Sequence, residues 1–198
     1  MTTTILHPEI RPTRATHQAR SVQTFVEAFH SDPTARWLFP EEATYSSAFT
    51  AFAKAFAGPA FQQKSAFHTT GFAGASAWFT PGVHGDDDAV IDVLEKFVPA
   101  DRLSEAFGIL EQMDAYHPTQ PHWYLPLLGV RPDSQGQGLG SRLLGHVLRQ
   151  CDETGHAAYL ESSNAANLTL YQRHGFKLMG EIQSGSSPIL YPMLRNPQ

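Results

Sequence analysis

The sequence is short of the features that mark secreted and membrane-spanning proteins. Its 198 residues include one cysteine, Cys151, so no disulfide can form within the chain, and a reducing compartment is expected. The N-terminus has no apolar stretch of signal-peptide length. No apolar run approaches the roughly 20 residues that a membrane-spanning helix needs. We therefore expect a soluble, cytoplasmic protein without a membrane partner.

Positive charge is also scarce. The chain has 14 Lys and Arg residues against 19 Asp and Glu, a formal net charge of −5. Because binding to nucleic acid needs a basic face, we expect no nucleic-acid partner. Ten histidines are present, but none form an HExxH frame or a pair at ligand spacing on a helix, so we expect no metal site. The sequence leaves a monomer and a homodimer equally open.

Hydrophobic residues make up 41% of the chain, enough for the core of one domain. Their spacing alternates between the periods of helices and strands, with turn residues between them. Helices are predicted over 17–29, 45–57, 90–116 (interrupted near Pro99), 139–153 and 164–174. Strands are predicted within 5–17 (short and broken by prolines) and over 66–70, 72–79, 122–130, 157–162, 176–182 and 189–194. This order predicts a mixed α/β fold with a strand, glycine loop, helix and strand at its centre.

The loop in "VRPDSQGQGLGSRLL", residues 130–144, holds three glycines between a predicted strand and a predicted helix. Such a junction offers bare backbone N–H groups and the positive end of a helix to a phosphate. It lacks the Lys of a P-loop and the spacing of the dinucleotide fingerprint. It fits a third pattern, Q/R-x-x-G-x-G/A after a strand that ends in Leu-x-Val. A tight turn without a ligand is the alternative.

Residues 122–179 resemble the GNAT acyltransferases, which transfer an acyl group from coenzyme A to an amine. A second motif, "LESSNAANLTLYQRHGF", carries the resemblance through Asn167, Tyr171, Gly175 and Phe176. The chain also resembles the branch containing puromycin acetyltransferase. The resemblance lies in "SDPTARWLFP" and "AWFTPG" of the N-terminal half and in "PHWYLPLLGV", which follows.

The resemblance implies the fold and its division. It implies an α/β fold of the α+β kind, with a mostly antiparallel central sheet, a V-shaped splay between two central strands and helices on both faces. One domain would span residues 1–198, with 1–117 as the acceptor-side half and 118–198 as the acetyl-CoA-binding half.

The resemblance also implies the residues that hold acetyl-CoA. The end of the splayed strand would bind the pantetheine arm, and the glycine loop would hold the pyrophosphate. Asn167 would contact the cofactor arm, or it is simply a polar helix residue. The strand and loop residues are Leu128, Gly129, Val130, Gln135, Gly136, Gln137, Gly138, Leu139, Gly140 and Ser141.

Four residues are candidates for the chemistry. Tyr171 matches the tyrosine that faces the coenzyme A sulfur in the family; a core tyrosine is the alternative. Alternation along the strand puts Leu128 on the same face as Tyr124 and His122, where relatives carry a Glu or His base. Tyr124 replaces a carboxylate there, so His122 is the favoured base, unless it only caps the strand. Glu161 is either a remote base or a partner of nearby backbone.

The acceptor is expected to meet aromatic side chains with few charges. Asp32, Arg36 and Trp37 follow the first helix, and Trp78 and Phe79 end a strand. Pockets for small molecules have this composition, although the aromatics could instead pack the core. We therefore predict an N-acetyltransferase acting on a small-molecule amine. The alternatives are a protein or peptide N-acetyltransferase and a non-catalytic acyl-CoA-binding module.

Overall fold

The computed structural model describes residues 8–198, so residues 1–7 of the predicted domain lie outside the described residues. The strands are β1 (Ile10–Pro12), β2 (Ala66–Thr69), β3 (Gly74–Phe79), β4 (His122–Val130), β5 (Ala157–Ser162), β6 (Lys177–Leu178) and β7 (Tyr191–Arg195). The α-helices are α1 (Gln18–Ala28), α2 (Pro33–Leu38), α3 (Glu42–Phe56), α4 (Gly58–Gln62), α5 (Asp87–Phe97), α6 (Leu103–Tyr116), α7 (Leu139–Thr154) and α8 (Leu168–Arg173).

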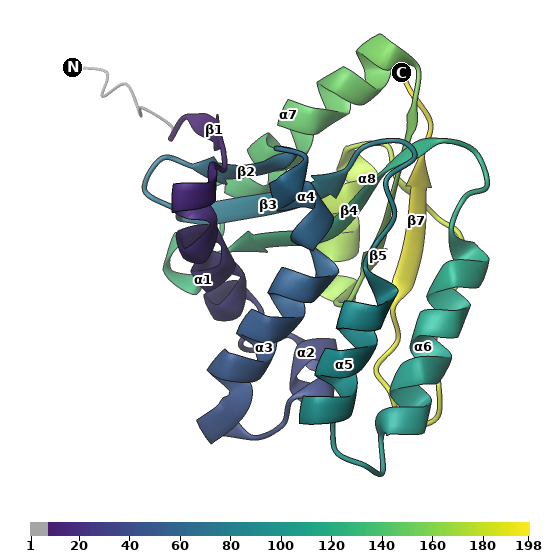
Figure 1. Cartoon of the computed structure of the whole chain (residues 1–198). Helices are drawn as coiled ribbons and strands as arrows, with labels where there is room; N and C mark the ends of the chain where they lie inside the picture. The colour runs from purple at the N-terminus through teal and green to yellow at the C-terminus, as the bar shows by residue number, and fades with distance from the viewer. Residues whose placement is uncertain (1–7) are drawn as a thin grey trace.

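The strands form one seven-stranded sheet in the order β1-β2-β3-β4-β5-β7-β6 (Figure 1). Among the strands of residues 8–198, only β4 and β5 pair in parallel, and every other pairing is antiparallel. The predicted hairpin is β2 and β3, and the two predicted final strands pair as β6 and β7. The mostly antiparallel GNAT-type sheet is therefore confirmed.

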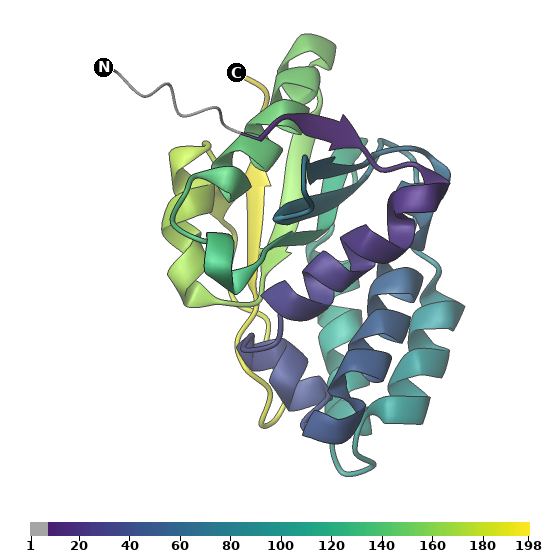
Figure 2. The same cartoon turned by 90° about the vertical axis from the view of Figure 1, so that its left-hand side faces the viewer.

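Helices cover both faces of this sheet, as Figure 2 shows from the side. On one face, α1, α3, α5 and α6 close a core around Phe25, Phe49 and Leu94. On the other face, α7 and α8 close a second core around Leu143, Val147 and Tyr171. The apolar side chains of α7 recur at helical spacing, which is why this helix lies flat on the sheet.

Two short helices, α2 and α4, were not predicted. Each has a proline in its first turn, where the missing N–H costs nothing. Asp32 caps α2 by accepting hydrogen bonds from the backbone N–H groups of Thr34 and Ala35, both at 3.0 Å. In the part of the chain that the structure describes, no helix is long and apolar enough to cross a bilayer.

The central strands β4 and β5 separate partway along their length. They pair at His122, Trp123 and Tyr124, opposite residues 157–159, and pairing stops there although β4 continues to Val130. The predicted splay is therefore present. From Leu125 onward, the side of β4 that faces β5 carries backbone groups without a partner strand.

A β-bulge in β4 accompanies the splay. Ala77 of β3 lies opposite Leu127, but Phe79 lies opposite Tyr124, so β4 has one extra residue. The bulge includes Pro126, which has no N–H to donate. As a result Leu127, not Leu128, shares the face of Tyr124. The prediction that His122, Tyr124 and Leu128 occupy one face was wrong at Leu128, because strict alternation fails across a bulge.

Candidate active site

One pocket lies at the splay, with a cavity volume of about 110 Å³. It reaches both faces of the sheet, since its walls include α2, α3, α5 and α6 on one side and α8 on the other. It brings together six residues predicted from the sequence, which come from both halves of the chain: Asp32, Tyr124, Leu128, Glu161, Asn167 and Tyr171.

Glu161 is the most unusual group in the pocket. Its side chain is only 3% exposed, and its Oε1 is buried without a hydrogen-bond partner among the described residues. Burial raises the pKa of this carboxyl to about 7, and the hydroxyl groups of Tyr124 and Tyr159, which face it, partly oppose the shift. A carboxyl with this pKa can accept or release a proton near neutral pH.

His117 lies beside Glu161. It was not identified as a site residue from the sequence. Its Nε2 is 3.5 Å from Oε1 of Glu161. Burial lowers the pKa of His117 to about 4, with a further contribution from His122. His117 follows α6 as the helix ends, so no periodic pattern in the sequence marks it. The contact joins residues 44 positions apart in the sequence and depends on the tertiary fold.

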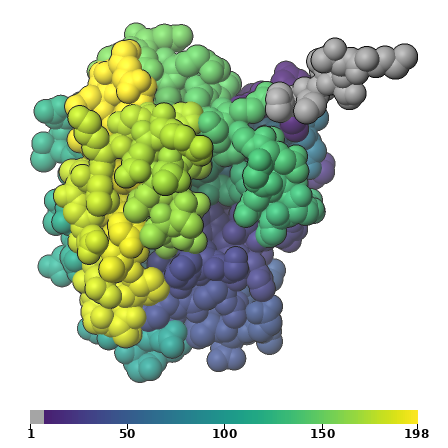
Figure 3. Space-filling model, turned by 180° about the vertical axis from the view of Figure 1, so that it is seen from behind, coloured from purple at the N-terminus to yellow at the C-terminus, as the bar shows by residue number. Residues whose placement is uncertain are grey.

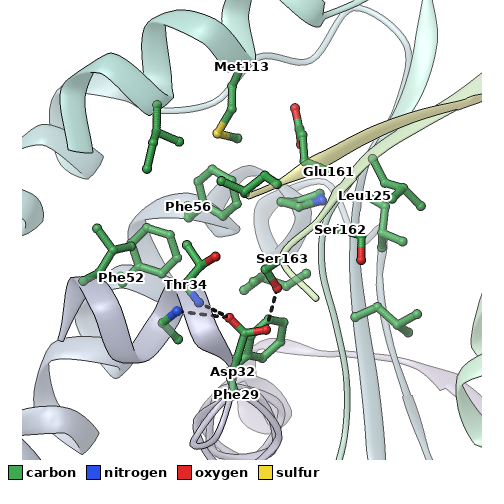
Figure 4. Close-up of a pocket in the computed structure, with 18 of the residues that line it drawn as sticks. Phe29, Asp32, Thr34, Phe52, Phe56, Met113, Leu125, Glu161, Ser162 and Ser163 are labelled. Atoms are coloured by element: carbon green, nitrogen blue, oxygen red, sulfur yellow. Dashed lines mark hydrogen bonds between the residues drawn. The ribbon is translucent and has the colours of Figure 1, made fainter. Parts of the chain in front are cut away.

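Asp32 occupies the opposite side of the pocket from Glu161 (Figure 4). One carboxylate oxygen caps α2, and the other accepts a hydrogen bond of 2.6 Å from the hydroxyl of Ser163. Burial raises its pKa, while these hydrogen bonds lower it. Asp32 therefore ties α2 to the loop after β5. The importance of Ser163 was not predicted, because only the fold brings it to Asp32.

The wall between these two carboxyl groups is apolar. Phe52 and Phe56 of α3 face Met113 of α6 across the cavity, and Leu125 of β4 lies on the sheet side (Figure 4). The remaining apolar wall residues are Phe29, Ala35, Leu38, Phe49, Leu94, Ala106, Ile109, Leu110, Pro126, Leu127, Leu128, Leu160 and Leu190. A molecule that fills this space must itself be largely apolar.

Tyr171 and Asn167 lie at the other end of the pocket, on and just before α8. Tyr171 is 7% exposed, and burial raises the pKa of its hydroxyl. It therefore stays protonated at neutral pH and can donate a hydrogen bond. Gly175 lies just beyond α8, as predicted, and has φ +88°. This left-handed backbone conformation is common after a helix end and favours glycine.

The glycine loop lies on the same face as α8 (Figure 3, green beside yellow-green). Gly136 and Gly138 have φ +74° and +76°, so the backbone itself requires glycine there. A Cβ at either position would meet no protein atom within 4 Å. Gly138 precedes the 16-residue α7, whose N-terminus has no side-chain cap. Open space and free N–H groups at a long helix fit a phosphate ligand.

Of the other predicted cofactor-binding residues, some contact the rest of the protein and others are exposed to solvent. Gln135 donates a hydrogen bond of 3.1 Å to the carbonyl of Val130, which holds the loop against β4. Gln137 is exposed and Leu139 is buried. The hydroxyl of Ser141 lies 2.6 Å from Nε2 of His174. A Cβ on Gly129 would lie 2.8 Å from the Cβ of Ala28, so Gly129 is required by the close approach of α1.

Four residues predicted for catalysis or for the acceptor do not line this pocket. His122 donates from Nδ1 to the carbonyl of Gln120 at 2.8 Å, beyond the closed end of the splay. Trp37 donates to the hydroxyl of Ser186 at 3.3 Å, at the outside of the fold. Trp78 and Phe79 are corrected to core residues. Trp78 is fully buried on the α7 face, and Phe79 packs edge-on to Tyr124 beneath the pocket.

Within residues 8–198, no three His, Cys, Asp or Glu side chains are grouped as a metal site would require.

The chain is similar to known acetyltransferases. Residues 87–176 match the model of the acetyltransferase (GNAT) family. An uncharacterized N-acetyltransferase of Schizosaccharomyces pombe is 25% identical over 177 residues, which cover 79% of this chain and 69% of that protein.

Solved structures share the fold over nearly the whole chain. A histone acetyltransferase HPA2 and related acetyltransferase from Corynebacterium glutamicum has a TM-score of 0.70 at 24% identity and covers 98% of both chains. A polyamine N-acetyltransferase of Drosophila melanogaster, which forms N-acetylagmatine, has a TM-score of 0.64 at 15% identity and covers 95% of this chain and 99% of its own. Fold, matched segment and relatives together support the GNAT acetyltransferase family, and the chain is an acyltransferase enzyme.

Proposed function

We propose that the protein transfers the acetyl group of acetyl-CoA to the amine of a small molecule with an apolar body, by direct attack in a ternary complex. The observation that carries the proposal is the single pocket at the splay. It joins a buried carboxyl of raised pKa, a protonated tyrosine and an apolar wall, with the open glycine loop on the α8 face.

Acetyl-CoA, when bound, supplies the acetyl group as a thioester. In the proposal, the loop from Gln135 to Ser141 and the N-terminus of α7 hold its phosphates. The unpaired edge of β4 at Leu128 and Val130, together with Asn167, holds its pantetheine arm. Alignment of the two reactants is itself worth roughly 7–11 kcal/mol.

Two groups would act on protons. Glu161 in its carboxylate form accepts a proton from the ammonium, directly or through water, because its pKa of about 7 lies near the operating pH. Tyr171, held in its neutral form by burial, donates a hydrogen bond to charge that develops on sulfur. Tyr124 faces Glu161 and orients its carboxyl. His122 is left with no direct part in this pocket.

The acceptor would lie between Asp32 and Glu161 against the aromatic wall. Two buried carboxyl groups favour a cation, and aromatic faces attract an ammonium by about 0.5–2 kcal/mol. The neighbour from Drosophila melanogaster acts on an amine, which is in line with such an acceptor. In this assignment residues 8–117 supply most of the acceptor wall, and Glu161 and Leu190 come from the second half.

The test is release of coenzyme A thiol in the presence of an amine panel. The panel contains arylalkylamines, agmatine, polyamines, amino acids, aminoglycosides, puromycin and a histone peptide. We expect amines with one positive charge and an apolar body to react fastest. Exclusive activity on the peptide, or on aminoglycosides, would contradict the proposed acceptor. Binding of acetyl-CoA without turnover of any amine would favour a non-catalytic binding module.

A further inference from the structure

His117 connects the buried carboxyl of Glu161 with the outside of the protein. The side chain of Glu161 is 3% exposed, whereas that of His117 is 31% exposed. Their facing atoms, Oε1 and Nε2, are 3.5 Å apart. Because Nε2 faces the carboxyl and about a third of the His117 side chain is exposed, the imidazole lies between the pocket and water.

Aromatic neighbours hold the His117 ring in this orientation. It lies edge-on to Tyr124 of β4 and Tyr159 of β5, with ring centroids 4.6 Å and 4.7 Å away. The ring of His122 is a third neighbour, with its centroid 5.6 Å away. These contacts restrict rotation of the imidazole, so the approach to Glu161 is built into the closed end of the splay.

Acetyl transfer to a primary ammonium releases one proton net. The ammonium carries three N–H protons, the amide keeps one, and the thiol product takes one. The third must leave the pocket in every cycle, and Glu161 can take part in a second cycle only after losing it. A buried carboxyl therefore needs a partner that returns this proton to water.

We propose that His117 is a proton-relay residue that restores the carboxylate of Glu161 after each transfer. The O–H bond of Glu161 breaks as an N–H bond forms at Nε2 of His117, and the proton on Nδ1 passes to water. The imidazole is neutral before and after this exchange, and it recovers its first tautomer by exchange with water. This inference rests on the proposed acetyl transfer.

The charges around the pair suit a neutral relay. The groups that face His117 are His122 on β4, Asp114 on α6 and His84 in the loop after β3, and those that face Glu161 are the hydroxyls of Tyr124 and Tyr159. Burial and His122 keep the pKa of His117 well below neutrality. His117 thus has a free nitrogen lone pair where Glu161 carries the proton to be removed.

The test compares His117→Ala and His117→Gln with the wild-type protein. We expect kcat to fall about 10- to 100-fold in both, at the lower end of the effect of groups that transfer protons. The dissociation constant of acetyl-CoA, measured by calorimetry, should not change. Added imidazole should restore kcat in His117→Ala, where a cavity replaces the ring, but not in His117→Gln. His30→Ala, which removes an exposed histidine outside the pocket, is the matched control.

Each result decides the matter. A kcat within twofold of wild type in both variants, or a loss in His117→Ala that imidazole does not relieve, would overturn the relay. If His117→Ala does not fold, the kcat of His117→Gln and its solvent deuterium isotope effect decide, and an unchanged pair of values overturns the relay. Failure of the wild-type protein to acetylate any amine would instead overturn the proposed function, and the relay with it.

Discussion

The two ends of the proposed site are built from different materials. The region beside α8 is built largely from backbone: the unpaired edge of β4, together with the glycine loop and the start of α7, which adjoin the pocket without lining it. The acceptor end is built from side chains of α2, α3, α5 and α6, which the sequence separates widely. The first end suits one invariant ligand, whereas the second can change its specificity by replacing single side chains.

The charged groups are also divided between the ends. Glu161 and Asp32 belong to the wide, apolar part, where burial raises the pKa of both. In the loop from Gln135 to Ser141, by contrast, no side chain carries a charge. In the proposed function, attraction of an anion there would depend on N–H groups and the helix dipole. Variants that act on one end and not on the other test this division.

The largest effect is expected from Glu161→Gln. Loss of the base should lower kcat by about 10²- to 10⁴-fold, while acetyl-CoA affinity is unchanged. In the wild-type protein, activity should rise with pH through about 7 as the carboxyl loses its proton, and the variant should lack this rise. A pH–rate profile checks both, with the exposed Glu181→Gln as control.

The same substitution should stabilise the fold above neutral pH. Because the folded state raises the pKa of Glu161 from its ordinary value to about 7, the carboxylate form is disfavoured by folding. Stability is therefore lost as the pH rises from about 4.5 to about 7, by an amount on the order of 3 kcal/mol. Thermal unfolding at pH 8 should show a higher Tm for Glu161→Gln than for wild type. A lower Tm for Glu161→Gln would contradict the inference that folding disfavours the carboxylate form of Glu161.

Tyr171→Phe should give the next largest effect. Removal of one donor to developing charge costs about 10- to 1,000-fold in the chemical step. The ring and its packing against Phe176 remain, so folding and acetyl-CoA affinity should not change. Single-turnover kinetics give the rate, and Tyr191→Phe, outside the pocket lining, is the control. A rate within twofold of wild type would make Tyr171 a purely structural residue.

Gly140→Ala should weaken acetyl-CoA binding by about tenfold, or roughly 1.4 kcal/mol. Gly140 has ordinary φ, and an added Cβ would come no closer than 3.5 Å to Leu170, so the protein itself tolerates alanine. Gly145→Ala, further along α7, is the matched control and should be neutral or slightly stabilising. Calorimetry that shows equal affinity in both variants would contradict close approach of the ligand to the loop.

Much of the α8 end could be predicted from the sequence, because short motifs encode it. The loop, α7 and the Tyr171 helix are each continuous segments with a recognisable pattern, and all were located correctly as elements. The clearest error there was the face of Leu128. It arose because a single bulged residue reverses the alternation along a strand.

The acceptor end was predicted poorly for a physical reason. Trp78 was chosen as an aromatic residue near the end of a predicted strand, but aromatic residues also fill cores, and only the packing decides between the two. Phe52, Phe56 and Met113 lie on helices whose amphipathic patterns predict burial without showing that a cavity remains beside them. The pairs His117–Glu161 and Asp32–Ser163 likewise arise only when distant segments meet.

The smallest effect, and the sharpest test of the acceptor end, is expected from Phe52→Leu. Phe52 lies on the pocket wall and is only partly buried, so leucine keeps an apolar surface at little cost in stability. It removes the aromatic face, whose attraction for an ammonium is about 0.5–2 kcal/mol. The KM for a cationic amine should therefore rise about 2- to 30-fold by the same principle, while kcat and the acetyl-CoA dissociation constant stay unchanged. The exposed Leu178→Ala on β6 is the control. An equal rise in KM for acetyl-CoA would mean that the two ends are coupled, and an unchanged amine KM would mean that the acceptor does not contact the aromatic wall.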